Sequence, residues 1–461
     1  MNRWKDAGAL GAKALRALTG RTAFCVAFLL LWFAQRVEPE RIGQVLTYIL
    51  FPWAAALAFP MLTLRDTPRR RGYGFLIALF VWYLVCCLYN RQYSFYINEA
   101  FWYQLLFACF IFYPQGERDW TLRRMQVVLY PFMAGFFLLG AVGLWLAAHG
   151  IWIPGDNGQS IGLETWSGYR LDLLCQTNVM GALAALSGMF SAFFFLHSGR
   201  VGRMLNALNI AMTVLLLAMS QSRTTAIAWS CCMALLAGRG AYYALRDRRP
   251  GGHAAARFVC AALAGALALG AGLYGLRALC SGALSLMERP NVALAETVEP
   301  EEAQEEAEVA DDGLESRAYD SMDNLENREK LWLGTLRMFA DRPDTLLFGV
   351  TRKGLWENVG AYEPLMYTHT HLHNAYLQTA AAGGLPSLLL LLAFGVVVAR
   401  RAWPMLFGRG GMRGSPILSL MIVFVLICCL MESYVGFTED LINVLFFYAC
   451  GCVMAVADRR A

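Results

Sequence analysis

Residues His373 to Arg400 read HNAYLQTAAAGGLPSLLLLLAFGVVVAR, and this stretch decides the class of fold. Between its ends it holds no charged residue, and it is longer than the roughly 20 residues that a helix needs to cross a bilayer. Similar apolar runs recur from residue 22 to the C-terminus. They are continuous rather than alternating, which excludes a transmembrane β-barrel. We therefore expect an all-α, polytopic membrane helix bundle.

Composition agrees with this fold class and excludes several functions. Of 461 residues, 57% are hydrophobic and only 16% are charged, too apolar a balance for an ordinary soluble domain. The formal net charge of +5 shows no basic domain that would bind nucleic acid. The 13 cysteines lie almost entirely within apolar runs and form no CxxC pair. Structural zinc and a disulfide framework are therefore not expected.

The apolar runs divide the chain into about twelve predicted spans. Nine spans fall within 1–280, after a basic amphipathic N-terminus, and three within 372–461, with a large loop at 281–371 before the tenth span. The predicted spans are 22–35, 42–63, 73–90, 95–113, 125–148, 172–196, 204–220, 224–240, 258–280, 372–398, 416–433 and 440–456.

Charge in the loops predicts the orientation, because lysine and arginine stay on the cytoplasmic side. Alternate loops are basic, with Arg70, Arg203, Arg248 and Arg401 among their residues. The opposite short loops carry few positive charges. This pattern puts both termini in the cytoplasm and 281–371 outside.

The outer loop has two parts of different composition. The acidic run AETVEPEEAQEEAEVADDGLE holds few large apolar residues, and we expect it to be disordered. From residue 324, apolar residues recur near helical spacing until Pro343. We expect a short helix here, lying across the outer face.

Four groups of polar residues face outward in this frame. Ser222 and Arg223 form a tight turn between two apolar runs, while Arg170 and Asn178 stand at the entrance to the sixth span. Arg328 lies on the predicted outer helix. Each arginine also has a structural interpretation, as a snorkelling, packing or solvated residue. An isolated arginine on the outer face is nevertheless unusual under the charge bias.

The fourth group is the run Thr368-His369-Thr370-His371-Leu372-His373-Asn374, which opens the tenth span. Three alternating histidines in an extended segment would line one face and could bind a metal. A helix starting near His373 would instead bring only His369 and His373 together. Proton transfer by a histidine and a purely structural role are the other two interpretations.

These groups together suggest a ligand. Arginine pairs bidentately with phosphate oxygens, and the acids Glu432 and Glu439 lie in the neighbouring outer loop. A lipid-linked diphosphate, with its tail in the bilayer and its headgroup at the outer interface, fits this set. The expected reaction is displacement of the diphosphate by an acceptor hydroxyl.

Four segments, in this order, resemble the O-antigen ligase and O-antigen polymerase superfamily over roughly residues 165 to 400. They are GYRLDLLCQTNVMGALAAL, SQSRTTAIA, NREKLWLGTLRMFADRPDTLLFGV and, most specifically, HNAYLQTAAAGGLPSLLLLL. The resemblance implies a GT-C-like bundle of about twelve spans. The sequence departs from the family pattern in two places: the acidic insert before Arg328, and the segment GGLPS, where many members have a glycine-rich turn without proline.

The resemblance also implies a bacterial inner-membrane, metal-independent inverting glycosyltransferase without a cofactor. It would move a glycan from undecaprenyl diphosphate to a lipid A core sugar on the periplasmic side, in contact with membrane lipid. Arg223 and Arg328 would bind the diphosphate, and His373 would activate the acceptor hydroxyl. Arg170, Asn178, Ser222 and Asn374 would line the substrate cavity.

Several functions remain open at this stage. A polymerase, whose acceptor is a growing glycan, and a protein-glycosylating transferase share these landmarks. Ligase is favoured because no soluble domain follows the last span in the sequence. A lipid-diphosphate transporter or flippase belongs to another class, and it should carry polar residues through the middle of its spans.

Overall fold

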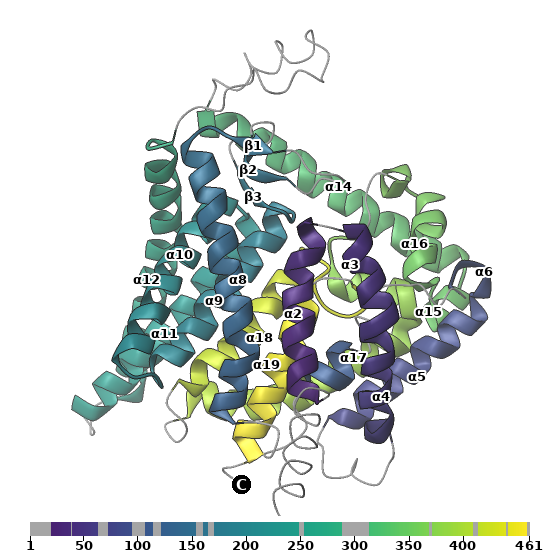
Figure 1. Cartoon of the computed structure of the whole chain (residues 1–461), viewed down its shortest axis with the longest axis horizontal. Helices are drawn as coiled ribbons and strands as arrows, with labels where there is room; N and C mark the ends of the chain where they lie inside the picture. The colour runs from purple at the N-terminus through teal and green to yellow at the C-terminus, as the bar shows by residue number, and fades with distance from the viewer. Residues whose placement is uncertain are drawn as a thin grey trace, which may run out of the picture.

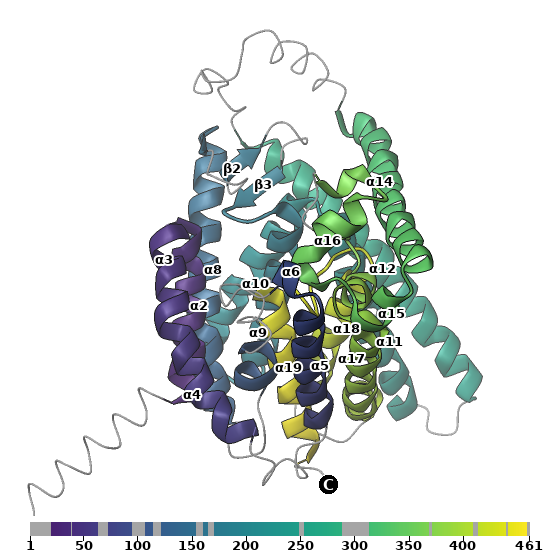
Figure 2. The same ribbon diagram turned by 90° about the vertical axis from the view of Figure 1, so that its right-hand side faces the viewer.

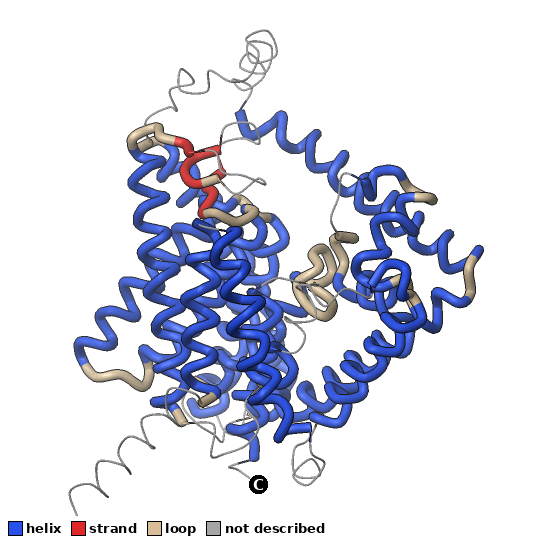
Figure 3. Tube along the Cα trace, turned by 45° about the vertical axis from the view of Figure 1, so that its right-hand side comes forward, coloured by secondary structure: helices blue, strands red, loops and turns tan. Residues whose placement is uncertain are grey.

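The computed structural model describes residues 20–37, 39–62, 72–94, 107–113, 121–153, 160–164, 170–248, 253–287, 313–367, 371–408, 414–438 and 441–458. Nearly all of them are helical (Figures 1 and 3). The N-terminal half contains α2 (Arg21–Val37), α3 (Pro39–Val45), η1 (Leu46–Leu50), α4 (Phe51–Leu62), α5 (Tyr73–Tyr89), α6 (Arg91–Ser94), η3 (Phe107–Phe112), α8 (Leu122–Ala148), α9 (Thr177–Phe195), α10 (Arg200–Ser220) and α11 (Arg223–Arg248).

The remaining helices follow in chain order. They are α12 (Ala254–Leu284), α14 (Gly313–Asp341), α15 (Asp344–Phe348), α16 (Thr351–Gly360), η6 (Pro364–Tyr367), α17 (Ala375–Phe407), α18 (Ser415–Cys428) and α19 (Leu441–Asp458). Three short strands, β1 (Trp152–Ile153), β2 (Ile161–Glu164) and β3 (Arg170–Leu173), form an antiparallel sheet in that order.

Within the described ranges, six helical segments are long and apolar enough to cross a membrane: 41–58, α8, α9, α10, α12 and α17. Shorter apolar helices are α5, α18 and 441–456 of α19. A polytopic helical membrane protein is therefore confirmed. The count of about twelve spans stays a prediction, because most of the predicted span 95–113 lies outside the described residues.

The bundle has two different ends. The sheet, α14 and α16 gather at one end, whereas the ends of α11 and α19 and the start of α12 lie at the other (Figures 1 and 2). The elements from the predicted outer loops thus share one end, as the charge pattern requires. Which end faces the periplasm stays a prediction.

Two local features differ from the sequence-based expectation. The predicted span 172–196 begins only at Thr177, because Arg170–Leu173 forms a strand paired with Ile161–Glu164. The fold is therefore not purely α-helical. The outer helix α14 begins at Gly313, earlier than expected, and ends at Asp341 just before Pro343. The acidic run before Gly313 and residues 1–19 lie outside the described residues.

Helix α17 is broken near its middle, which matters for the neighbouring elements. Gly384 has φ +72° and ψ 171°, a backbone conformation that residues other than glycine rarely adopt. Pro386 lacks the N–H that would continue the helix ladder. The carbonyl of Gly383, at the break, accepts a hydrogen bond from Trp82 Nε1 at 2.9 Å, so α5 is tied to the break. The part of α17 before the break is thereby held beside the elements at the α14 end of the bundle.

Candidate functional site

Four side chains distant in sequence meet at the outer end of the bundle, and we call them the outer cluster: Asn178, Arg328, His373 and Glu432. Glu432 is its centre. Its Oε1 accepts from Asn178 Nδ2 at 2.9 Å and from Arg328 Nη2 at 3.0 Å. Its Oε2 lies 3.1 Å from His373 Nδ1. The Glu432 side chain is only 3% exposed, so these contacts replace its hydration.

Hydrogen bonds of the backbone around Glu432 fix the position of this residue. It follows α18, and its N–H donates to the carbonyl of Cys428 at 2.9 Å. Its own carbonyl accepts from the N–H of Ala375 at 3.1 Å. The hydroxyl of Ser433 accepts from the N–H of Asn374 at 3.2 Å. The start of α17 and the turn after α18 are therefore joined directly beneath the carboxylate.

His373 occupies a strained position immediately before α17. Its φ is +50°, in the left-handed region that costs a non-glycine residue about 1 kcal/mol or more. The preceding carbonyl, of Leu372, accepts from Trp332 Nε1 on α14 at 2.8 Å. The following residue, Asn374, caps α17 by accepting from the N–H of Leu377 at 2.9 Å. Contacts on both sides thus hold the imidazole toward Glu432.

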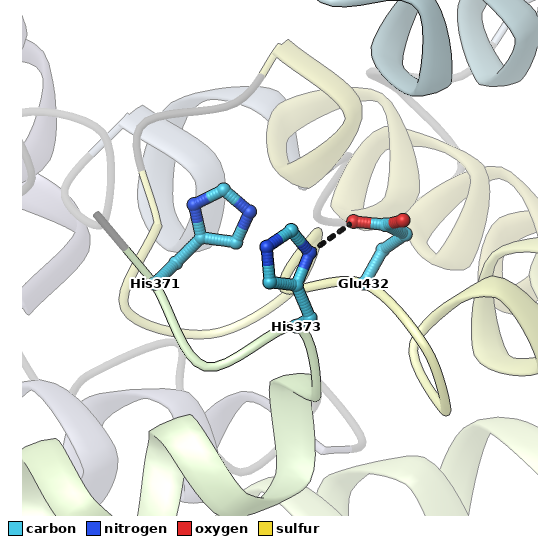
Figure 4. A group of neighbouring side chains, drawn as sticks. All are labelled: His371, His373 and Glu432. Atoms are coloured by element: carbon cyan, nitrogen blue, oxygen red, sulfur yellow. Dashed lines mark hydrogen bonds and ion pairs between the residues drawn. The ribbon is translucent and has the colours of Figure 1, made fainter. Parts of the chain in front are cut away.

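The Glu432 contact selects the tautomer of His373. An ionised carboxylate only accepts hydrogen bonds, so Nδ1 must carry the proton and donate it. The lone pair is then on Nε2, which faces His371 rather than Glu432 (Figure 4). The His373 side chain is 17% exposed, enough for a second molecule to approach. This arrangement suits a general base whose orientation is maintained by an acid.

Arg328 lies near the middle of α14, and its side chain is 19% exposed. Its contact with Glu432 uses one of the five N–H donors of a guanidinium. The others remain available for a phosphate next to the histidine. Asn178 contributes from the first turn of α9, whereas Arg170 precedes that helix as the first residue of β3.

Ser222 and Arg223 belong to the turn that joins α10 to α11, at the end of α9 that carries Asn178. Gln221, with φ +48°, ends α10, and Arg223 begins α11 with an exposed side chain. The turn packs against α9: a Cβ at Gly181 would come within 2.7 Å of the Ser220 hydroxyl. Gly181 is three residues from Asn178, so the turn and the cluster share one end of α9.

Arg170 occupies a different element from the other predicted site residues. It is the first residue of β3 and pairs in register with Glu164 of β2. Within β3, the buried Asp172 accepts a hydrogen bond from Ser160 at 2.6 Å. The sheet leads directly into α9, which places Arg170 near the cluster end. A role for it in the cavity remains a prediction.

Sequence analysis noted Glu432 but did not assign it to the site. The available signal was an acid between two apolar runs, where an unpaired charge is costly. Glu439, the other acid in that loop, lies outside the described residues. Asn374 caps α17 and donates from Nδ2 to the carbonyl of Leu430 at 3.1 Å, and its predicted place in the cavity stays a prediction.

The histidine run also contains a group with metal-ligating atoms. One such atom from each of His371, His373 and Glu432 lies within 4.8 Å of the other two. His369 lies outside the described residues, so the predicted three-histidine site is not tested. His371 and His373 are neighbours in a non-helical segment, with ring centroids 4.1 Å apart. Helix α17 begins at Ala375, so His373 precedes the helix, and the expected pairing of His369 with His373 is not tested.

Comparison with known families identifies the central segment. Residues 207–392, less than half of the chain, match the family described as O-antigen ligase. The match confirms the resemblance to the O-antigen ligase and polymerase superfamily. It includes Ser222, Arg223, Arg328 and His373, whereas Asn178 and Glu432 lie outside it. No curated protein matches the chain.

Proposed function

We propose that this protein is an O-antigen ligase-like glycosyltransferase. It transfers a glycan from undecaprenyl diphosphate to an acceptor hydroxyl, a lipid A core sugar, on the periplasmic face of the bacterial inner membrane. The observation that carries this proposal is the pairing of His373 and Arg328 through one buried carboxylate, at 3.1 and 3.0 Å. This pairing sets a candidate base beside a candidate diphosphate-binding side chain.

The reaction is a direct displacement at the anomeric carbon of the donor sugar. The acceptor oxygen forms the new bond while the bond from that carbon to the diphosphate oxygen breaks. The acceptor proton passes to Nε2 of His373, and the imidazolium is stabilised through Nδ1 by Glu432. Attack from the face opposite the leaving group inverts the anomeric configuration. Undecaprenyl diphosphate leaves with the electron pair of the broken bond.

Arginine side chains supply the positive charge for the leaving group. Arg328 holds its guanidinium beside the base, and Arg223 begins α11 at the same end of α9. Charge-assisted contacts to a diphosphate strengthen as negative charge develops on it. Such contacts give the reaction a route that needs neither metal nor cofactor. Arg170, Ser222 and Asn178 line the path of the substrates in this proposal.

The alternatives make different predictions in cells. A polymerase uses the same chemistry with a growing glycan as acceptor, and the family description favours ligase. A deletion strain that accumulates long glycans on the lipid carrier supports ligase. A strain that places a single repeat on the final acceptor supports polymerase. A flippase is disfavoured because the ionisable groups of the outer cluster gather at one end of the bundle rather than along a path through it.

The proposed orientation has its own test. Reporter fusions that are active only outside the membrane should work within 281–371 and fail at both termini. Activity from a fusion after Arg248 would reverse the orientation and move the outer cluster to the cytoplasm. The periplasmic reaction would then be excluded, whatever the family.

A further inference from the structure

The outer cluster is adjacent to a second histidine that the proposed reaction does not use. His371 lies beside His373, and Figure 4 shows the two imidazoles and the Glu432 carboxylate in a row with His373 between the others. One ligand atom from each residue lies within 4.8 Å of the other two. Two imidazoles and a carboxylate are a common set of metal ligands in proteins.

One of the three separations already matches a tetrahedral site. With bonds of about 2.0–2.1 Å, two ligand atoms of tetrahedral zinc are separated by about 3.3 Å. His373 Nδ1 and Glu432 Oε2 are 3.1 Å apart, near this spacing. The longest of the three separations needs to shorten by roughly 1.5 Å. We expect rotation of the His371 side chain to make that change.

The ligand set also selects the kind of metal. Imidazole nitrogen with one carboxylate oxygen suits Zn²⁺ and related divalent transition metals. Magnesium and calcium prefer oxygen ligands, so this set should discriminate against them. Three protein ligands leave a fourth position for water. Burial of Glu432, which is 3% exposed, keeps the anionic ligand in a region of low dielectric.

We infer that His371, His373 and Glu432 form a site for a divalent transition metal ion of the Zn²⁺ type, and that the bound ion inhibits transfer. If the ion binds Nδ1 of His373, the proton moves to Nε2 and that atom cannot accept another. If it binds Nε2, the lone pair is occupied. In both cases the base is lost. This consequence presupposes the transferase function proposed above, whereas metal binding does not.

Arg328 modulates the affinity of such a site. Its guanidinium lies 3.0 Å from Glu432 Oε1 and brings a positive charge next to the incoming ion. An ion bound to Glu432 would therefore have this cation as a near neighbour, and like charges a few ångströms apart repel when they are partly buried. Removing the charge should therefore tighten metal binding even though it weakens donor binding. A nonspecific surface site elsewhere on the chain would not respond to this change.

The decisive experiment measures Zn²⁺ binding to the full-length purified protein after removal of metals, by calorimetry. We expect one equivalent of Zn²⁺ to bind, and at least about tenfold weaker binding in His371→Ala. Arg328→Ala should bind more tightly than the unmodified protein. His149→Ala is the matched control, since His149 is exposed and contacts the carbonyl of Trp145. Equal Zn²⁺ affinity in His371→Ala and the unmodified protein overturns the site.

Transfer from a synthetic lipid diphosphate, assayed in parallel, tests the consequence. We expect Zn²⁺ to inhibit the unmodified protein and the His149→Ala variant reversibly, with recovery on adding chelator. His371→Ala should transfer at a near-normal rate without Zn²⁺ and should resist inhibition, and Mg²⁺ should inhibit neither. Equal inhibition of His371→Ala overturns the inhibitory role. If no protein transfers glycan even without Zn²⁺, the proposed function is contradicted. If Zn²⁺ binding in that case still depends on His371, the metal site itself is supported.

Discussion

Among the polar groups in the described part of this apolar bundle, two that involve α9 invite comparison. The outer cluster joins Asn178, Arg328, His373 and Glu432 at one end. A second group, which we call the buried polar patch, consists of Ser187, Ser191, Asn209 and Thr213 between α9 and α10. In it, Asn209 Nδ2 donates to Ser187 Oγ at 3.1 Å and to Ser191 Oγ at 2.6 Å. All four of its residues are buried.

The two groups differ in charge and in access. The buried polar patch is neutral, connects two consecutive helices and has no exposed member, so it acts as a packing contact. The outer cluster has three ionisable residues, and two of them are 17% and 19% exposed. It connects four segments rather than two. A neutral group closed to water holds helices together, whereas an accessible charged group can bind and react.

The largest effect should come from His373→Ala. A positioned base contributes roughly 10² to 10⁴-fold, so transfer should fall by that factor while the protein remains folded. The measurement is the rate of transfer from synthetic lipid diphosphate, together with thermal unfolding in detergent. His149→Ala is the control and should be normal in both. A variant that unfolds but retains its rate per folded molecule would give His373 a structural role.

Glu432→Gln should have the next largest effect. The amide keeps the size of the side chain but removes the charge that orients His373 and pairs with Arg328. Loss of charge-assisted bonds worth about 1.5–3 kcal/mol each should slow transfer about a hundredfold. Initial rates at saturating donor measure this. A normal rate would show that the strained backbone alone positions His373.

Arg328→Lys and Arg223→Lys should each slow transfer about tenfold to a hundredfold, although charge is retained. A diphosphate favours the bidentate fork, which an ammonium does not provide. One charge-assisted contact is worth roughly 1.5–3 kcal/mol. Rates across donor concentrations separate weaker binding from slower chemistry. If both variants are fully active at normal protein levels, the arginines are interfacial residues only.

A pair of asparagine variants contrasts the two polar groups directly. Asn209→Ala should lower stability by about 0.5–2 kcal/mol without changing the rate of transfer. Asn178→Ala removes a donor to Glu432 and should lower the rate more than the stability. Unfolding in detergent and transfer rates are compared for the two variants. Identical effects of both would remove the distinction between the cluster and the patch.

The smallest effect is expected within α14 itself. Glu326 pairs with Lys330 one turn away at 2.8 Å, and both side chains are well exposed. The hydrogen bond and charge of Lys330 lower the pKa of Glu326, so any stabilisation exists at neutral pH and disappears as pH falls through that pKa. Because both side chains are exposed, the pair contributes little even at neutral pH, and Glu326→Gln should leave stability and transfer nearly unchanged there. A marked loss of transfer would extend the site along the helix.

The membrane fold was predictable because its signal is local. The length of each apolar run by itself predicts a membrane span, and the basic residues beside the run predict its orientation. The same holds for the helix before Pro343, which ends at Asp341 as predicted. The three-stranded sheet was missed because strands of two to four residues carry almost no periodic signal.

For the site, the sequence by itself determined the candidates, and the tertiary structure decided which of them meet. Arg328 and His373 stood out because a charge or titratable group beside an apolar run needs a reason. Nothing local connects Asn178 to Glu432, 254 residues later, and only packing of α9 against the turn after α18 brings them within 2.9 Å. The centre of the cluster is therefore a tertiary result: one buried carboxylate needs several donors, and separate segments must supply them.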